Sequence, residues 1–279
     1  MIDLHSHTTA SDGTYTPEEL VRAAAELELE ALAITDHDTF SGYEQARETA
    51  NAVSLRLICG IELSTKIRSG DRRTVHLLGY FPKTEPAQEF RSWLLQMQEF
   101  RRDRNRRLAK RLQSMGIDVK LEEVEAVGKN MAGRPHFARL MVTKGYVSNY
   151  REAFDRYLDA SAPGYVDREE PTLEEGIRRL TDAGGISSIA HPVRLSMTDA
   201  AEEEELFATM ANRGLHAIEA FHSDHTAEDI ERYLGLARKY GLKVTGGSDF
   251  HGALKPNVQL GVGTGTLKIP LSVLEALID

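Results

Sequence analysis

The chain has 279 residues, a length that suits two ordinary domains or one barrel-sized domain with an insertion. Hydrophobic residues make up 41% of it and charged residues 28%, which is typical of a globular protein and excludes intrinsic disorder and collagen-like folds. With 34 basic and 43 acidic residues, the net charge is −9. We therefore expect no stable binding of duplex DNA, and a local cationic site for any phosphate-rich ligand.

Cellular location is indicated by the single cysteine and by the hydrophobic pattern. Cys59 cannot form an internal disulfide, which fits a reducing compartment. No apolar run approaches the roughly 20 residues of a membrane helix, and the N-terminus lacks the pattern of a secretory signal. We expect a cytoplasmic protein without a membrane partner. These features leave the oligomeric state open.

Short apolar strands alternate with capped helices in the first part of the chain. Thr16 with Glu19, and Ser41 with Glu44, each have the pattern of a capping box at the start of a helix. A Ser-Gly-Asp turn at 69–71 predicts a hairpin. Strands are predicted at 2–4, 31–34, 55–58, 61–67 and 74–80.

The middle of the chain, from about 85 to 157, is expected to be helical and is rich in arginine. Alternation resumes after Pro163, where Thr172 and Glu175 can cap a helix. Further strands are predicted at 186–190, 217–220 and 243–245, and further helices at 200–213 and 226–240. This alternation predicts a parallel α/β sheet, open or closed into a barrel. We divide the chain into a body at 1–84 and 163–279 and a helical insertion at 85–162.

Histidines and acids cluster at the ends of the predicted strands. Residues two apart on a strand point to the same side, so His5 and His7 can hold one ion together. Each residue alone has a structural explanation, but parallel α/β folds bring the carboxyl ends of their strands to one face. Burying so many ionisable groups together is costly unless cations neutralise them. The sequence therefore predicts a metal cluster of imidazole and carboxylate ligands, which suits manganese, iron or zinc.

These motifs resemble the polymerase-and-histidinol-phosphatase (PHP) family on both flanks of the chain. The matching segments are Asp-Leu-His-Ser-His-Thr at 3–8, Ile-Thr-Asp-His-Asp at 34–38, Gly-Ile-Glu at 60–62, Ala-His-Pro at 190–192 and Ser-Asp-Phe-His at 248–251. Gly-Arg-Pro-His-Phe-Ala-Arg at 133–139 resembles a subgroup of nucleotide phosphoesterases. The resemblance implies a distorted (β/α)7 barrel whose inserted helical domain caps the active site.

The resemblance also implies two to three divalent metal ions, with manganese preferred and iron or zinc as alternatives. The three implied positions are held by His5, His7, Glu62 and Asp249; by Glu62, His76 and His191; and by Asp12, His37 and His251. Asp36, beside His37, is expected to orient a ligand imidazole. His191 or a metal-bound water is expected to protonate the leaving group.

Members of the subgroup remove the 3′-phosphate of 3′,5′-bisphosphonucleotides, such as adenosine 3′,5′-bisphosphate, or trim short RNA from its 5′ end. The resemblance thus implies attack of a metal-bridging hydroxide on phosphorus, with a small nucleotide or short RNA as substrate. Arg134 and Arg194 are the expected phosphate contacts, because arginine offers phosphate two parallel donors. His136 and His222 are weaker candidates for substrate binding.

The strongest basic run, at 101–111, holds seven cations and is expected to be mainly solvated helix surface. Its less favoured interpretation is a funnel for an RNA chain. Other activities stay open: a histidinol-phosphate phosphatase or other small phosphomonoesterase, a non-catalytic metal-stabilised module, and C–N bond hydrolysis. The arginine-bearing insertion argues against the first, the complete ligand set against the second, and the arginines near the metals against the third.

Overall fold

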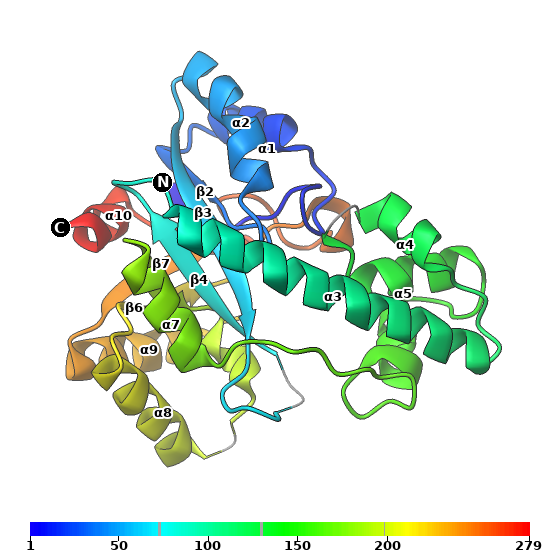
Figure 1. The fold of residues 1–279 in the computed structure, drawn as a ribbon. Helices are drawn as coiled ribbons and strands as arrows, with labels where there is room; N and C mark the ends of the chain where they lie inside the picture. The colour runs from blue at the N-terminus through cyan, green and yellow to red at the C-terminus, as the bar shows by residue number, and fades with distance from the viewer. Residues whose placement is uncertain (72–73, 129–130, 198) are drawn as a thin grey trace.

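The computed structural model describes residues 1–71, 74–128, 131–197 and 199–279. Residues 72–73, in the predicted hairpin connection, and 129–130, in the predicted helical middle, lie outside the described residues. A seven-stranded sheet runs in chain order from β1 to β7 and curls into a nearly closed barrel (Figure 1). The strands are β1 Ile2–Asp3, β2 Ala31–Ile34, β3 Arg56–Thr65, β4 Val75–Phe81, β5 Ile186–Ile189, β6 Ala217–His222 and β7 Lys243–Gly247. Beside the first strand, the Leu4 N–H donates to the Gly246 carbonyl oxygen at 3.1 Å, which joins the two edges of the sheet.

Strand β4 departs from the parallel arrangement that the alternation predicts. It runs antiparallel to both β3 and β5, whereas the other neighbouring strands are parallel. The reason is the predicted hairpin, because a short connection without a helix can join only antiparallel strands. The separate strands predicted at 55–58 and 61–67 form one ten-residue strand, β3.

Helices cover the outside of the barrel and begin where most of the predicted caps lie. They are α1 Pro17–Glu26, α2 Ser41–Ala52, α7 Leu173–Asp182, α8 Ala200–Asn212, α9 Ala227–Tyr240 and α10 Leu271–Ile278, with short 3-10 turns at Pro192–Leu195 and Gly252–Leu254. The Thr16 hydroxyl accepts a hydrogen bond from the Glu19 N–H at 3.2 Å, as predicted. The box predicted at Ser41 is wrong: Ser41 is already helical, and its N–H donates to the Thr39 hydroxyl at 3.1 Å.

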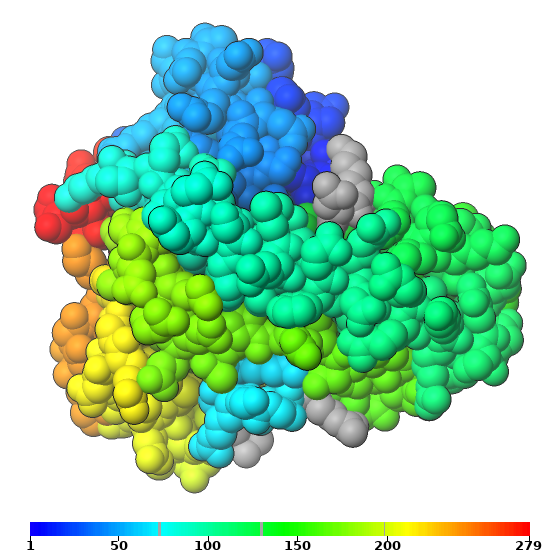
Figure 2. All heavy atoms as spheres, in the orientation of Figure 1, coloured from blue at the N-terminus to red at the C-terminus, as the bar shows by residue number. Residues whose placement is uncertain are grey.

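A second group of helices lies between β4 and α7 and projects to one side of the barrel (Figures 1 and 2). It contains α3 Gln88–Ser114, α4 Leu121–Gly128, α5 Arg134–Thr143, α6 Tyr150–Ala153 and a π-helical turn at Phe154–Leu158. Phe90 and Trp93, early in α3, pack in the barrel core, whereas Leu108 and Leu112 pack with Phe137 in a separate core. Within the described ranges, no helix is both long enough and apolar enough to span a bilayer.

Candidate metal centre

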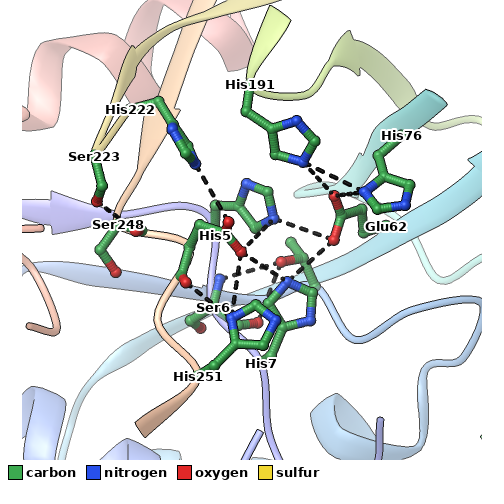
Figure 3. A network of polar contacts seen from close by, with 12 residues as sticks. His5, Ser6, His7, Glu62, His76, His191, His222, Ser223, Ser248 and His251 are labelled. Atoms are coloured by element: carbon green, nitrogen blue, oxygen red, sulfur yellow. Dashed lines mark hydrogen bonds and ion pairs between the residues drawn. The ribbon is translucent and has the colours of Figure 1, made fainter. Parts of the chain in front are cut away.

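The predicted metal ligands lie together at one end of the barrel (Figure 3). His5 and His7 follow β1, Glu62 lies in β3 and His76 in β4, and His191 follows β5. The remaining members, Asp12, His37, Asp249 and His251, come from loops that follow β1, β2 and β7. Isolated bridges between Ser6 and Phe250 and between His37 and Glu62 hold these loops side by side.

Glu62 is at the centre of this cluster. Its carboxylate oxygens lie close to a ring nitrogen of each of five histidines: His76 Nδ1 at 2.8 Å, His7 Nε2 at 3.0 Å, His191 Nε2 at 3.0 Å, His5 Nε2 at 3.3 Å and His37 Nδ1 at 3.3 Å. Burial alone would raise the pKa of the Glu62 carboxyl. The charges of His76 and His37 outweigh this effect and hold the pKa well below its ordinary value. Glu62 can therefore act as an ionised bridge between neighbouring cations.

Two further carboxylates complete the cluster. Asp249 Oδ1 lies 3.4 Å from His7 Nε2 and 3.6 Å from His5 Nε2. Asp12 Oδ1 lies 3.4 Å from His251 Nε2, and its second oxygen lies 3.8 Å from His37 Nε2. Groups whose possible ligand atoms all lie within 4.8 Å of one another are His7, Asp12, His37 and His251; His5, Glu62 and His191; His5, His7 and Asp249; His37, Glu62 and His76; and His5, Glu219 and His222.

Unpartnered nitrogens show that these residues fit a cation. His5 Nε2, His7 Nε2 and His37 Nδ1 are buried and have no hydrogen-bond partner. Buried polar atoms are nearly always paired, so such orphans need an explanation. A divalent ion supplies the missing partner, because neutral imidazole nitrogen and carboxylate oxygen are the donors that manganese, iron and zinc accept.

The backbone at two of these residues is strained. Asp249 has φ 57° and His191 has φ 28°, a region that residues with a Cβ rarely adopt. Such conformations cost of order 1–3 kcal/mol each and cluster at functional sites. Each residue lies two positions beyond the end of a barrel strand, β5 for His191 and β7 for Asp249, and its side chain belongs to the cluster.

Asp36 does not contact any imidazole in the way the sequence predicts. Its oxygens accept hydrogen bonds from the Thr8 N–H at 2.8 Å, the Thr8 hydroxyl at 2.7 Å and the Ser11 hydroxyl at 2.6 Å. Ser11 Oγ in turn lies 3.4 Å from His7 Nδ1. Asp36 therefore shapes the loop after β1 and reaches His7 only through Ser11.

Arg194, His222 and His136, the other residues predicted to bind substrate, differ in their contacts. Arg194 Nη1 pairs with Asp249 at 2.9 Å, and Nη2 pairs with Asp224 at 2.6 Å, so both ends of its guanidinium are occupied. His222 is buried, with Nε2 3.4 Å from Asp249 Oδ2. His136 is buried at the start of α5, where its Nδ1 accepts a hydrogen bond from the Gly133 N–H at 3.1 Å.

A pocket of about 140 Å³ adjoins the cluster and is lined by four arginines, Arg101, Arg104, Arg134 and Arg168. Asp12, His37 and His76 line the same pocket, so the arginines share one space with the candidate metal ligands. Arg101 and Arg104 belong to the run that the sequence predicts to be solvated, yet they are only 8% and 6% exposed. That prediction is wrong for these two positions.

The arginines differ in how their charges are balanced. Arg101 and Arg168 both pair with Asp38, whose Oδ1 also accepts a hydrogen bond from the Ser64 N–H at 2.8 Å. Arg104 forms no hydrogen bond or ion pair with any residue that the structure describes. Burial, and then the neighbouring arginine charges, hold the pKa of Arg104 well below its ordinary value. Among the described residues, the Arg104 guanidinium therefore has no direct ion-pair partner in this pocket.

Comparison with known proteins identifies the family. Residues 3–166 match the model of the PHP domain. The chain belongs to the PHP domain family. A 5′–3′ exoribonuclease of Escherichia coli is 36% identical over 254 residues, which cover 89% of this chain and 84% of the relative. A 3′,5′-nucleoside bisphosphate phosphatase of Chromobacterium violaceum is 34% identical over 253 residues, which cover 90% of this chain and 87% of the relative. A solved structure from Bifidobacterium adolescentis, assigned as a metal-dependent phosphoesterase, aligns with TM-score 0.85 and 33% identity over 99% of this chain and 95% of the other.

Two buried charged residues next to the site of this PHP domain protein, Arg168 and Glu219, are not among the residues predicted from the sequence. Arg168 lies in the segment that returns from the helices to the barrel, and nothing in its local sequence marks it as buried. Glu219 is fully buried in β6, and the visible signal was an acid inside the apolar run Ala-Ile-Glu-Ala. A charge that interrupts an apolar strand needs a buried partner.

Proposed function

We propose that the protein is a metal-dependent phosphoesterase that removes the 3′-phosphate of 3′,5′-bisphosphonucleotides or trims short RNA from its 5′ end. The observation that carries the proposal is the pocket in which Arg104 and Arg134 face the same space as His37 and His76. It combines a site for divalent ions with cationic charge for a phosphate. Relatives with nearly equal identity are named for the two different substrates, so the similarity supports both.

Two to three divalent ions, manganese in preference to iron or zinc, are part of this proposal. The proposed ligands are His5, His7, Glu62 and Asp249 for the first ion; Glu62, His76 and His191 for the second; and Asp12, His37 and His251 for the third. When bound, such ions make hydroxide available near neutral pH and neutralise phosphate oxygens. The unpartnered ring nitrogens and the ionised Glu62 support these assignments.

The chain's own residues have distinct tasks in this reaction. Arg134 and Arg104 bind phosphate oxygens at the edge of the cluster, each with a planar array of donors. Burial and the charge of Arg194 hold the pKa of His191 well below its ordinary value, so its ring is neutral. His191 Nε2 lies 3.0 Å from Glu62, the proposed bridging carboxylate, which supports a role for this residue as a metal ligand over that of proton donor to the leaving group.

We also propose that the helical insertion at 85–162 caps the active site of a barrel formed by 1–84 and 163–279. A hollow of about 280 Å³ over the cluster supports this division. Its lining includes His37, His191 and Asp249 from the barrel, and Tyr150 and Phe154 from the helices. A cytoplasmic location belongs to the same proposal and is supported by the lone buried thiol of Cys59.

The test is product analysis with manganese present. Adenosine 3′,5′-bisphosphate, a short 5′-phosphorylated RNA and histidinol phosphate are offered in parallel, and phosphate and nucleotide release are measured. We expect turnover of one or both nucleotide substrates, and a loss of kcat/KM in Arg134→Ala. Arg106→Ala is the matched control, because Arg106 is exposed on α3 and pairs with Asp103. Turnover of histidinol phosphate alone would overturn the proposal.

A further inference from the structure

Glu219 is a fully buried carboxylate beside the metal centre, and both of its oxygens are engaged. Oε1 lies 2.9 Å from His5 Nδ1. Oε2 accepts a hydrogen bond from the His191 backbone N–H at 2.6 Å. One side chain of β6 therefore contacts the residues that follow β1 and β5.

We infer that Glu219 is a positioning residue that holds His5 in the tautomer with the proton on Nδ1, so that the bare Nε2 faces the metal centre. The inference rests on the proposed metal centre and deepens it. A carboxylate only accepts hydrogen bonds, so the ring nitrogen that faces Glu219 must be the one that carries hydrogen. In a neutral imidazole the lone pair then lies on the other nitrogen.

The surroundings of His5 Nε2 agree with this assignment. That atom is buried without a hydrogen-bond partner and lies 3.3 Å from Glu62 Oε2 and 3.6 Å from Asp249 Oδ1. A lone pair is the arrangement that a shared cation requires.

Glutamine at position 219 cannot reproduce both contacts of Glu219, because the His191 backbone N–H requires an acceptor. The His191 N–H is a fixed donor, held at the strained φ of 28°. In Glu219→Gln the amide oxygen must accept from this N–H, and the NH₂ group then faces His5 Nδ1. That ring nitrogen becomes an acceptor, and its hydrogen moves to Nε2, where it blocks the metal position.

His222 shows that the histidines here are fixed individually. Its Nδ1 accepts a hydrogen bond from the Asp224 N–H at 3.0 Å, so the hydrogen of the neutral ring lies on Nε2. This is the tautomer opposite to that of His5. His5, Glu219 and His222 are therefore a poor metal site in spite of their proximity, because Glu219 is already engaged and His222 presents a donor.

The test compares metal binding by wild type, Glu219→Gln and Glu219→Ala after removal of metal with a chelator. Manganese titration and bound-metal stoichiometry are measured, and thermal unfolding of the metal-free proteins checks the fold. We expect a loss of about 10- to 100-fold in affinity for Glu219→Gln, the usual effect of removing a residue that orients a ligand. Glu219→Ala should lose less, because either tautomer of His5 is then accessible. The control is Glu203→Gln, since Glu203 is also buried but is held by the Tyr233 hydroxyl at 3.1 Å.

A direct readout is the ¹⁵N spectrum of His5 in the zinc-loaded wild type, which should show the ring hydrogen on Nδ1. Wild-type affinity in Glu219→Gln, a larger loss in Glu219→Ala than in Glu219→Gln, or a hydrogen on Nε2 would each overturn the inference while leaving the metal centre in place. A wild-type protein that binds no divalent ion would overturn both the inference and the proposed function.

Discussion

Substitution of Arg104 by methionine should change stability and substrate binding in opposite directions. Arg104 is buried beside three other arginines and is paired with none of the residues that the structure describes. Methionine has a similar volume and no charge, so Arg104→Met removes the cost of the buried guanidinium and relieves repulsion within the pocket. The same change removes a donor for the substrate's phosphate.

The size of both effects follows from the setting of the residue. Replacing buried charges by apolar side chains of similar volume often stabilises a protein by about 1–4 kcal/mol. A chain of 279 residues unfolds with an entropy of about 0.6 kcal/mol/K, so the Tm should rise by about 2–7 °C. Losing a charge-assisted hydrogen bond of about 1.5–3 kcal/mol should raise KM roughly tenfold to hundredfold.

The assay combines calorimetry of the metal-loaded protein without substrate and steady-state kinetics with adenosine 3′,5′-bisphosphate or short RNA. Arg106→Met, an exposed position on the same helix, should shift neither the Tm nor KM appreciably. A fall in Tm together with an unchanged KM would show that Arg104 stabilises the helices instead of binding substrate, and would refute the reasoning.

Three further predictions concern the cluster and its support. Asp38→Asn leaves the buried Arg101 without its anion, whereas Arg168 keeps its pair with Glu170, and should lower the free energy of unfolding by about 3–5 kcal/mol in urea titrations; a loss below about 1 kcal/mol would contradict this. Burial alone would raise the pKa of Asp38, but Arg101 and Arg168 hold it well below its ordinary value. The loss of unfolding free energy should therefore be constant from about pH 5 to 8 and shrink only in acid. Burial alone would lower the pKa of His7, but the carboxylates of Asp249 and Glu62, 3.4 Å and 3.0 Å from its Nε2, raise this pKa from 6.5 to about 9. The stabilisation from this imidazolium is therefore complete below about pH 6.5 and lost towards pH 9 in the metal-free protein, while manganese affinity rises over the same range; an affinity independent of pH would argue against it. Asp249→Ala should abolish hydrolysis and reduce bound metal while circular dichroism stays near wild type, and an active variant would remove Asp249 from the ligand set.

The gathering of the candidate metal ligands could be predicted from sequence because it depends on short-range rules. The pair His5 and His7 shares one side of an extended segment, and strand ends meet at one end of the barrel. Motif spacing therefore places His191 and Asp249 in the cluster although they are far from His5 along the chain. The antiparallel β4 follows from its hairpin in the same local way.

The arginine pocket could not be predicted, because burial of a helix face depends on what packs against it. Arg101 and Arg104 share a face of α3 with Leu108, a spacing visible in the sequence, but seven cations in one run read as solvent-exposed. Asp38 and Arg168, which lie far apart in the chain, decide the outcome. Ser41 failed as a cap for a smaller reason, since the neighbouring Thr39 supplies the acceptor.

Helix α3 is a single rod of 27 residues whose two ends belong to different hydrophobic cores, with Arg101 and Arg104 between them. Because both ends of α3 are anchored, the helix itself fixes where these guanidiniums lie relative to the candidate metal ligands, and loop conformation has little influence on it. A substitution along this part of α3 can therefore change the charge of the pocket without moving the histidine cluster at the end of the barrel.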